Sequence, residues 1–142
     1  MAKRIQYKKL IQGDHCSIVS KVVKNGFTEI DIFVDSLSDS FTSSIEGLYQ
    51  IMEEYAKNGG ELLTTNNCHK AHTEKEISIY EYRKGRLRVY WFYDAKERNI
   101  VVCSHGVIKS TQKTAKSDKE KAINAYRQYH NNKESIIILE DD

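Results

Sequence analysis

Three short β-prone runs, residues 77–83, 86–94 and 99–108, constrain the fold more than any other part of the chain. The first two runs are separated by Lys84-Gly85, and the next gap holds only a few residues. Parallel neighbours in a sheet need a crossover of a dozen or more residues, whereas antiparallel neighbours need only a tight turn. The spacing therefore predicts an antiparallel meander.

Side chains in the middle run alternate between two faces, as in any strand. One set is apolar or aromatic: Leu87, Val89, Trp91 and Tyr93. The other set mixes cations and rings: Arg86, Arg88, Tyr90 and Phe92. We expect the first set to face the core and the second to leave Arg88 and Tyr90 on an open face.

Two helices are expected before the meander. Residues 28–37 have apolar positions at helical spacing, and Thr28 with Asp31 has the form of a capping box. The same stretch is rich in β-branched residues, so a strand over 30–34 is the alternative to a short helix. A longer amphipathic helix is predicted over 40–57, where apolar residues recur on one face.

The two ends of the chain leave alternatives open. Residues 4–11 and 17–23 are β-prone and form either a hairpin or one strand that joins the main sheet. Ser117 and Glu120 predict the start of a third helix after the meander. The tail from 134 to 142 is an apolar run with acids, suited to an added strand or to docking on a basic groove.

Together these elements predict an α+β fold: a small antiparallel sheet of about four strands, packed against two N-terminal helices, with a C-terminal helix. The chain of 142 residues is expected to form a single domain, residues 1–142. It would carry an N-terminal extension over about 1–25 and an acidic tail over about 134–142. The polar stretch 64–76 has neither helical nor strand periodicity and is expected to be a long loop.

Positive charge is concentrated near the meander. Residues 69–116 hold eleven Lys or Arg and five acids, a balance of +6, while the whole chain has a net charge of +2. This distribution suits a phosphate-binding face on an otherwise nearly neutral protein.

Several other classes of protein are disfavoured. The three cysteines are odd in number and form no CxxC pair, which argues against a disulfide framework and fits a reducing cytoplasm. Apolar runs are too short for a signal peptide or a membrane span. Cys68, His69 and His72 form the one cluster with metal-ligand chemistry, but no second pair stands at usual zinc spacing, so no metal site is predicted.

Three motifs carry a resemblance to a known family: YEYR at 80–83, GRLRVYW at 85–91 and HGVIKSTQKT at 105–114. In this order the sequence resembles the RelE/ParE superfamily of toxins from type II toxin–antitoxin systems, and within it the HigB-like, phage-derived group. The motifs match that group's ELR, its Gly-x-Arg-aliphatic strand and its HGFxKKxxKTP loop. The chain departs from the loop pattern at Val107, Ser110 and Ala115.

The resemblance implies a RelE-like fold and a ribosome-dependent endoribonuclease that cuts messenger RNA in the cytoplasm without a cofactor. It also implies two partners: mRNA on the ribosome, and a cognate antitoxin of the helix-turn-helix, HigA-like kind. Two other functions stay open. One is a ParE-like inhibitor of DNA gyrase, and the other is a non-catalytic RNA-binding or decayed toxin.

RNA cleavage through the 2′-hydroxyl needs a base, an acid and cations around the phosphate. Arg88 on a rigid strand suits a phosphate because a guanidinium meets two oxygens at once. His105 is the histidine within the matched motif, and Lys109 and Lys113 match family lysines. The predicted catalytic residues are Arg88, His105, Lys109 and Lys113. The predicted substrate-binding residues are Arg83, Tyr90, Lys70 and Lys75.

Overall fold

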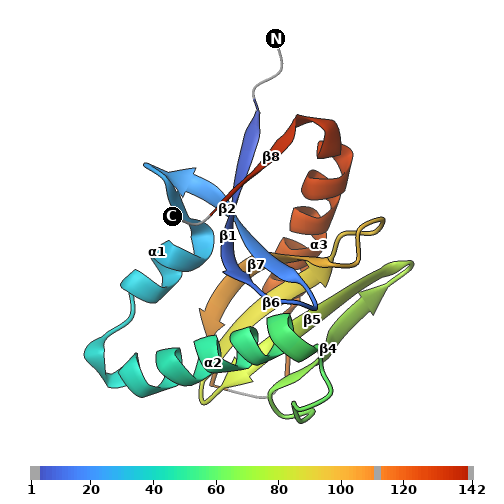
Figure 1. Ribbon diagram of the computed structural model, residues 1–142. Helices are drawn as coiled ribbons and strands as arrows, with labels where there is room; N and C mark the ends of the chain where they lie inside the picture. Colours follow the sequence, from blue (N-terminus) through green and yellow to red (C-terminus); the bar gives the residue numbers. More distant parts are fainter. Residues whose placement is uncertain (1–3, 111–112, 141–142) are drawn as a thin grey trace.

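A computed structural model describes residues 4–110 and 113–140 (Figure 1). Residues 1–3 of the predicted extension, 111–112 of the basic loop and 141–142 of the acidic tail lie outside the described residues. The helices are α1 (Glu29–Asp35), α2 (Thr42–Asn58) and α3 (Lys116–Asn131), with short 3-10 turns at Asp39–Phe41 and Lys133–Ser135. The strands are β1 (Ile5–Gln12), β2 (Ser17–Lys24), β3 (Phe27–Thr28), β4 (Cys68–Glu74), β5 (Ile77–Lys84), β6 (Leu87–Tyr93), β7 (Ile100–Ile108) and β8 (Ile136–Leu139).

These strands form one mixed sheet in the order β4-β5-β6-β7-β2-β1-β8, with β3 paired to β2. The meander from β5 to β7 is antiparallel, as predicted, and β4 adds to its outer edge. The α+β class is confirmed. The predicted small sheet of about four strands is wrong, because β2 pairs in parallel with β7 and β8 pairs in parallel with β1.

The predicted start of the fold on two helices is also wrong, because three strands precede α1. If the sheet ended at β7, the outer backbone N–H and C=O groups of this strand would be unpaired. Strand β2 of the N-terminal hairpin β1–β2 forms hydrogen bonds with them. In the tail, the strand alternative is confirmed by β8. Figure 1 shows β8 running beside β1 after the chain leaves α3.

Helices cover both faces of the sheet (Figure 1). On one face α2 buries Leu48 and Met52 against Trp91, so the predicted core face of β6 is confirmed. On the other face α3 packs Ala122 and Ile123 against the ring of Tyr90. Since α3 folds back over this side, β6 is buried on both faces.

The predicted open face is therefore wrong. Arg88 is 4% exposed and Tyr90 is 1% exposed, and Tyr90 belongs to the same buried cluster as Ala122 and Ile123 of α3. Sequence periodicity identified the two faces of β6 but not the layer that covers the second one. The cations of this face are thus enclosed and need partners inside the protein.

The stretch predicted as a long loop contains β4. Cys68–Glu74 pairs antiparallel with β5 and forms one edge of the sheet. Its polar composition hid the strand, because an edge strand has one side open to water and needs fewer apolar residues. His69 is placed directly opposite Glu81 by this pairing.

A β-bulge interrupts β7 near its middle. Trp91 pairs with Cys103 and Tyr90 pairs with His105, which leaves Ser104 as the extra residue. Cys103 packs in the core on the α2 side, while His105 lies beside the ring of Tyr90 on the α3 side. Residues two apart normally share a face, so the bulge turns His105 toward α3.

Of the two predicted capping boxes, one is confirmed and the other is wrong. The Thr28–Asp31 capping box is present, and the short helix α1 replaces the strand alternative. The Ser117–Glu120 box is absent. Helix α3 begins one residue before Ser117, and its N-cap is Ala115, which has no side-chain oxygen to offer.

Gly106 follows His105 and packs against α1. A Cβ at this position would overlap the ring of Phe33. Replacing Gly106 with Ala should lower the free energy of unfolding by about 1–3 kcal/mol, as expected when a packed site is overfilled. Gly60→Ala is the control, since a Cβ there meets only Tyr55 at 4.0 Å, and its effect should stay within about 0.5 kcal/mol. Urea unfolding of both variants measures the difference, and equal stabilities would contradict the packing.

Candidate functional site

Four polar side chains form a row across the meander. His69, Glu81, Tyr90 and His105 are successive cross-strand partners on β4, β5, β6 and β7. Neighbouring strands lie about 4.7–4.9 Å apart, so side chains in such a row touch their neighbours. The row faces α3 and groups two imidazoles, a carboxylate and a phenol at one level of the sheet.

Two arginines form the adjacent row. Arg83 and Arg88 are opposite each other on β5 and β6, next to the turn at Gly85. The Glu81 carboxylate lies between them and the first row: its Oε1 is 3.9 Å from Arg83 Nε and its Oε2 is 3.8 Å from Arg88 Nε. Glu81 is 2% exposed, so the charge of this carboxylate is balanced by cations inside the protein.

His69 completes the surroundings of Glu81. Its Nε2 is 2.7 Å from Glu81 Oε1, and its Nδ1 is 2.7 Å from the carbonyl oxygen of Thr65. A carbonyl only accepts, so Nδ1 carries a proton. The short contact at Nε2 requires one further proton, shared between His69 and Glu81. The two residues therefore form a hydrogen-bonded dyad.

Arg88 is held by its own turn. Its Nη1 donates to the carbonyl oxygens of Gly85 at 2.8 Å and Leu87 at 2.9 Å. Its Nε has no hydrogen-bond partner among the described residues. Burial, followed by the repulsion of Arg83, lowers the pKa of Arg88 below its usual value. The guanidinium is fixed in place with donor capacity left over for an anion.

A second acid–base group lies at the end of β7. His105 Nδ1 is 2.8 Å from Ser104 Oγ, and His105 Nε2 is 3.1 Å from Asp118 Oδ1. The other carboxylate oxygen of Asp118 accepts from Lys109 Nζ at 3.3 Å. Asp118 is in the first turn of α3, where the helix dipole favours a negative charge.

Backbone contacts fix Lys109 beside this group. Its N–H donates to the carbonyl oxygen of Arg86 at 2.7 Å, and Arg86 Nε donates back to the carbonyl oxygen of Lys109 at 3.1 Å. This pair of hydrogen bonds extends the β6–β7 pairing by one step. The basic loop therefore leaves the sheet in a defined direction.

Tyr90 lies between the two acid–base groups. Burial raises the pKa of Tyr90 to about 12, with further contributions from Glu81 and Asp118. The nearby Thr114 hydroxyl opposes this rise, although no hydrogen bond of normal geometry joins Tyr90 Oη to any described residue. The phenol is therefore a neutral donor near neutral pH.

An open hollow of about 700 Å³ adjoins this assembly at the N-terminus of α3. Its lining includes one acid, Asp118, and four cations: Lys109, Lys113, Lys116 and Lys119. The N-terminal end of a helix adds partial positive charge. The hollow is thus suited to an anion.

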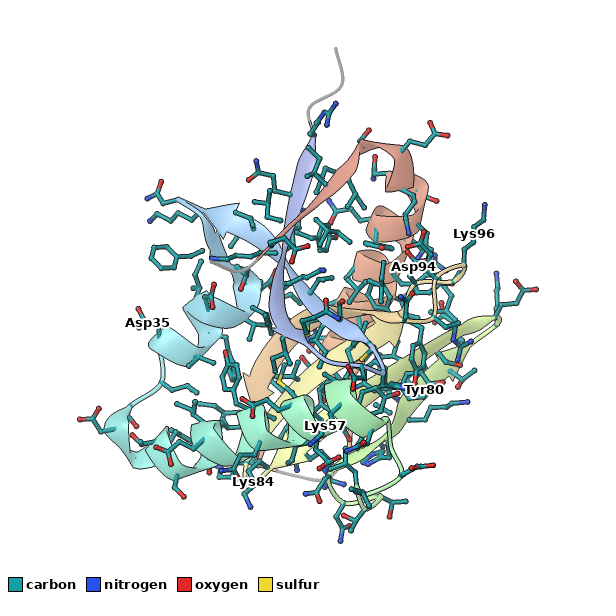
Figure 2. All side chains as sticks on the ribbon, in the orientation of Figure 1. Asp35, Lys57, Tyr80, Lys84, Asp94 and Lys96 are labelled. Carbon is teal, nitrogen blue, oxygen red and sulfur yellow. The ribbon has the colours of Figure 1, made fainter. Side chains whose placement is uncertain are left out.

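The site lies at one end of the sheet. Figure 2 labels Lys84 next to the β5–β6 turn at this end, and Asp94 and Lys96 at the other end of the meander. The described residues contain no group of three or more His, Cys, Asp or Glu arranged to hold a metal ion. No described helix has the length and apolar character needed to cross a membrane.

Six of the eight residues predicted from the sequence come together here: Arg83, Arg88, Tyr90, His105, Lys109 and Lys113. Lys70 and Lys75 do not. Lys70 pairs with Tyr80, on the α2 side of the sheet, and its Nζ is 5.9 Å from the centre of that ring. Lys75 lies in the β4–β5 turn, at the far end of that hairpin from His69.

The list of predicted site residues did not include Glu81, His69 or Asp118. Glu81 was recognisable from its period-two relation to Arg83 within YEYR. The pairing of His69 with Glu81 was not expected, because β4 was predicted to be a loop. Asp118 carries no local signal, since its contacts depend on where α3 packs.

Comparison with protein families gives one match. The family model described as "Phage derived protein Gp49-like (DUF891)" matches residues 34–127, about two thirds of the chain. The chain belongs to this Gp49-like family. No curated protein matches it. The matched segment of this Gp49-like chain spans β4 to β7 and most of α3, and so contains the whole candidate site, whereas β1, β2 and β8 lie outside it.

The burial of His105 gives a pH-dependent stability. Desolvation lowers the pKa of His105 below 6.5, with Asp118 opposing the shift. As the pH falls below 6.5 the unfolded chain binds a proton before the folded one, so the unfolding free energy should decrease until the folded pKa is passed. His105→Gln should show a smaller decrease. Chemical denaturation of both proteins between pH 8 and pH 5 tests this, and identical pH profiles would contradict it.

Proposed function

We propose that this Gp49-like chain is a HigB-like toxin of the RelE/ParE superfamily and cleaves messenger RNA on the ribosome. One observation carries the proposal: a carboxylate, two arginines and two histidines share one face of the meander, within the matched segment. These are the groups that transesterification of RNA needs. A regulatory antitoxin of the helix-turn-helix, HigA-like kind and a cytoplasmic location follow from the same proposal.

Every bond and proton in this reaction is accounted for without a metal ion. The ribose 2′-oxygen attacks the adjacent phosphorus and forms a P–O bond, while the bond from phosphorus to the 5′-oxygen breaks. A base takes the proton of the 2′-hydroxyl, and an acid gives a proton to the leaving 5′-oxygen. The products are a 2′,3′-cyclic phosphate and a 5′-hydroxyl.

Glu81 is the base in this scheme. Its Oε2 is 3.8 Å from the nearest cation nitrogen, Arg88 Nε, and so has acceptor capacity to spare, while Oε1 is engaged by His69. The proton taken from the 2′-hydroxyl joins the Glu81–His69 dyad. His105, next to Tyr90 on the other side of the row, is the acid in its protonated form, which the contact with Asp118 favours against the desolvation that lowers its pKa.

The two arginines neutralise the phosphate. Charge grows on the non-bridging oxygens as phosphorus becomes five-coordinate, and a guanidinium held rigidly stabilises that charge more than a mobile one. Arg88 is held by two carbonyls, and Arg83 is its cross-strand neighbour. Lys109 and Lys113 supply further positive charge along the RNA backbone.

A non-catalytic RNA-binding protein is the second candidate, and the closed geometry favours it. Arg88 and His105 are 4% and 2% exposed, and both ring nitrogens of His105 have partners within the chain. Such a protein would bind RNA with strong salt dependence and leave it intact. A gyrase inhibitor needs no buried acid–base row, so the site gives it no support.

Cleavage of ribosome-bound mRNA tests the proposal. The wild-type protein should cut the message and leave 2′,3′-cyclic phosphate and 5′-hydroxyl ends, and a single 2′-deoxy nucleotide at the cut position should prevent the cut. Glu81→Gln keeps the size of the side chain and should slow cleavage by about 10²–10⁴-fold, the usual contribution of a general base. The rate is read from single-turnover assays on programmed ribosomes.

Arginine variants supply the matched control. Arg88→Lys keeps a cation but loses the planar fork, and it should lower the rate by at least about tenfold. Arg98→Ala removes a guanidinium that stacks on Tyr93, near the opposite end of β6, and should cleave like wild type. Intact mRNA with wild-type protein would overturn the enzymatic proposal, and DNA damage on expression would favour gyrase as the target.

A further inference from the structure

The carboxylate of Asp118 bridges two cationic or proton-donating groups that the proposed reaction requires. One oxygen is 3.1 Å from His105 Nε2 and the other is 3.3 Å from Lys109 Nζ. A phosphate group binds two side chains in the same arrangement, with each of two oxygens facing one donor. The carboxylate therefore presents to these two donors the single negative charge and the two acceptor oxygens that a phosphodiester would present.

Both donors are engaged by Asp118. His105 is 2% exposed and Lys109 is 9% exposed, and the second nitrogen of His105 is occupied by Ser104. A proton on Nε2 thus points at Asp118 and at no other group. Any anion that uses Nε2 and Nζ together must replace this carboxylate.

The hollow at the start of α3 provides the way in. Asp118 lines it together with Lys113, Lys116 and Lys119, so an anion inside the hollow would lie beside the carboxylate in a field of positive charge. The N-cap of α3, Ala115, makes no side-chain hydrogen bond to the first turn. The helix end adds to the attraction for an anion.

We propose that Asp118 occupies the position of an RNA phosphate group, and that RNA binds by displacing this carboxylate from His105 and Lys109. The inference rests on the proposed function, since it takes RNA as the ligand of this face. It assigns a phosphate-binding position, in addition to that of the two arginines, to the two donors at the end of β7. It also makes the unbound protein self-inhibited, because His105 Nε2 is released only when a phosphate arrives.

The first turn of α3 offers a displaced Asp118 carboxylate another hydrogen-bond donor. Asp118 is the third residue of α3, and an acid at this position accepts a hydrogen bond from the backbone N–H of the N-cap residue in a capping box. In the proposed RNA-bound state the Asp118 side chain turns toward this N–H, and the helix cap replaces its contacts with His105 and Lys109.

Binding to a short RNA with a 2′-deoxy nucleotide at the cut position tests displacement without any cleavage. Asp118→Asn removes the competing charge and should tighten binding about tenfold, well within the effect of one charge at contact distance. Glu120→Gln removes the same charge from the same helix at an exposed position, where the acid is 4.0 Å from Lys116, and should change affinity less than about twofold. Fluorescence anisotropy gives both dissociation constants, and thermal melting confirms that both variants are folded.

Weaker binding by Asp118→Asn than by wild type would overturn the inference, because it would make Asp118 a support for the site and not a competitor. A measurement on the wild-type protein decides the matter even if the variant does not fold. Titration with the same RNA should shift the ¹⁵N resonance of His105 Nε2 as Asp118 leaves, while His130 serves as an internal reference far from the site. RNA binding with an unchanged His105 signal would also overturn it.

These measurements separate the two proposals. Displacement of Asp118 by RNA together with a wild-type protein that cuts no message would remove the enzymatic proposal and keep the phosphate position. Cleavage of mRNA with His105 undisturbed by RNA would keep the enzymatic proposal with another residue as the acid, and would remove the displacement of Asp118.

Discussion

The packing of α3 across the meander is the interaction on which the candidate site depends. Ala122, Ile123 and Tyr129 pack with Tyr90 and Phe92 on the α3 side of the sheet, and Glu81 and Arg88 are buried on the same side. A charge removed from water is stable only with partners of opposite charge or hydrogen bonds. The acid–base row and the arginine pair therefore meet these buried charges with partners inside the protein. Burying these charges, even in pairs, costs more free energy than leaving them on an open surface. The result is a set of side chains held in fixed positions.

The far end of α3 is anchored independently of the site. Tyr129 Oη donates to Asp94 Oδ2 at 2.6 Å, and Lys133 pairs with the same carboxylate. Asp94 also accepts the N–H groups of Lys96 and Glu97 through its other oxygen, so this one buried acid joins the β6–β7 turn to the end of α3. With that end fixed, the position of Asp118 in the first turn of α3 follows from the length of the helix.

The bulge in β7 and the β4 edge show how backbone geometry selects the chemistry. Without Ser104 as an extra residue, His105 would share the face of Cys103 and lie in the core on the α2 side. Without β4, the carboxylate of Glu81 would lack His69. Of the strands outside the family match, β2, β1 and β8 extend the sheet beyond β7, and none of them contributes a residue to the site.

The sequence by itself determined the meander, the three helices and the identity of most cations on the site face, because turn spacing and apolar periodicity are local signals. These local signals do not show which faces of the sheet other elements cover. Arg88 was therefore expected in solvent, whereas it is buried in the structure. The partners Glu81, His69 and Asp118 come from three different elements that are up to 49 residues apart. Tertiary structure alone decided their meeting, since cross-strand register, a one-residue bulge and the path of α3 are long-range properties that no local pattern encodes.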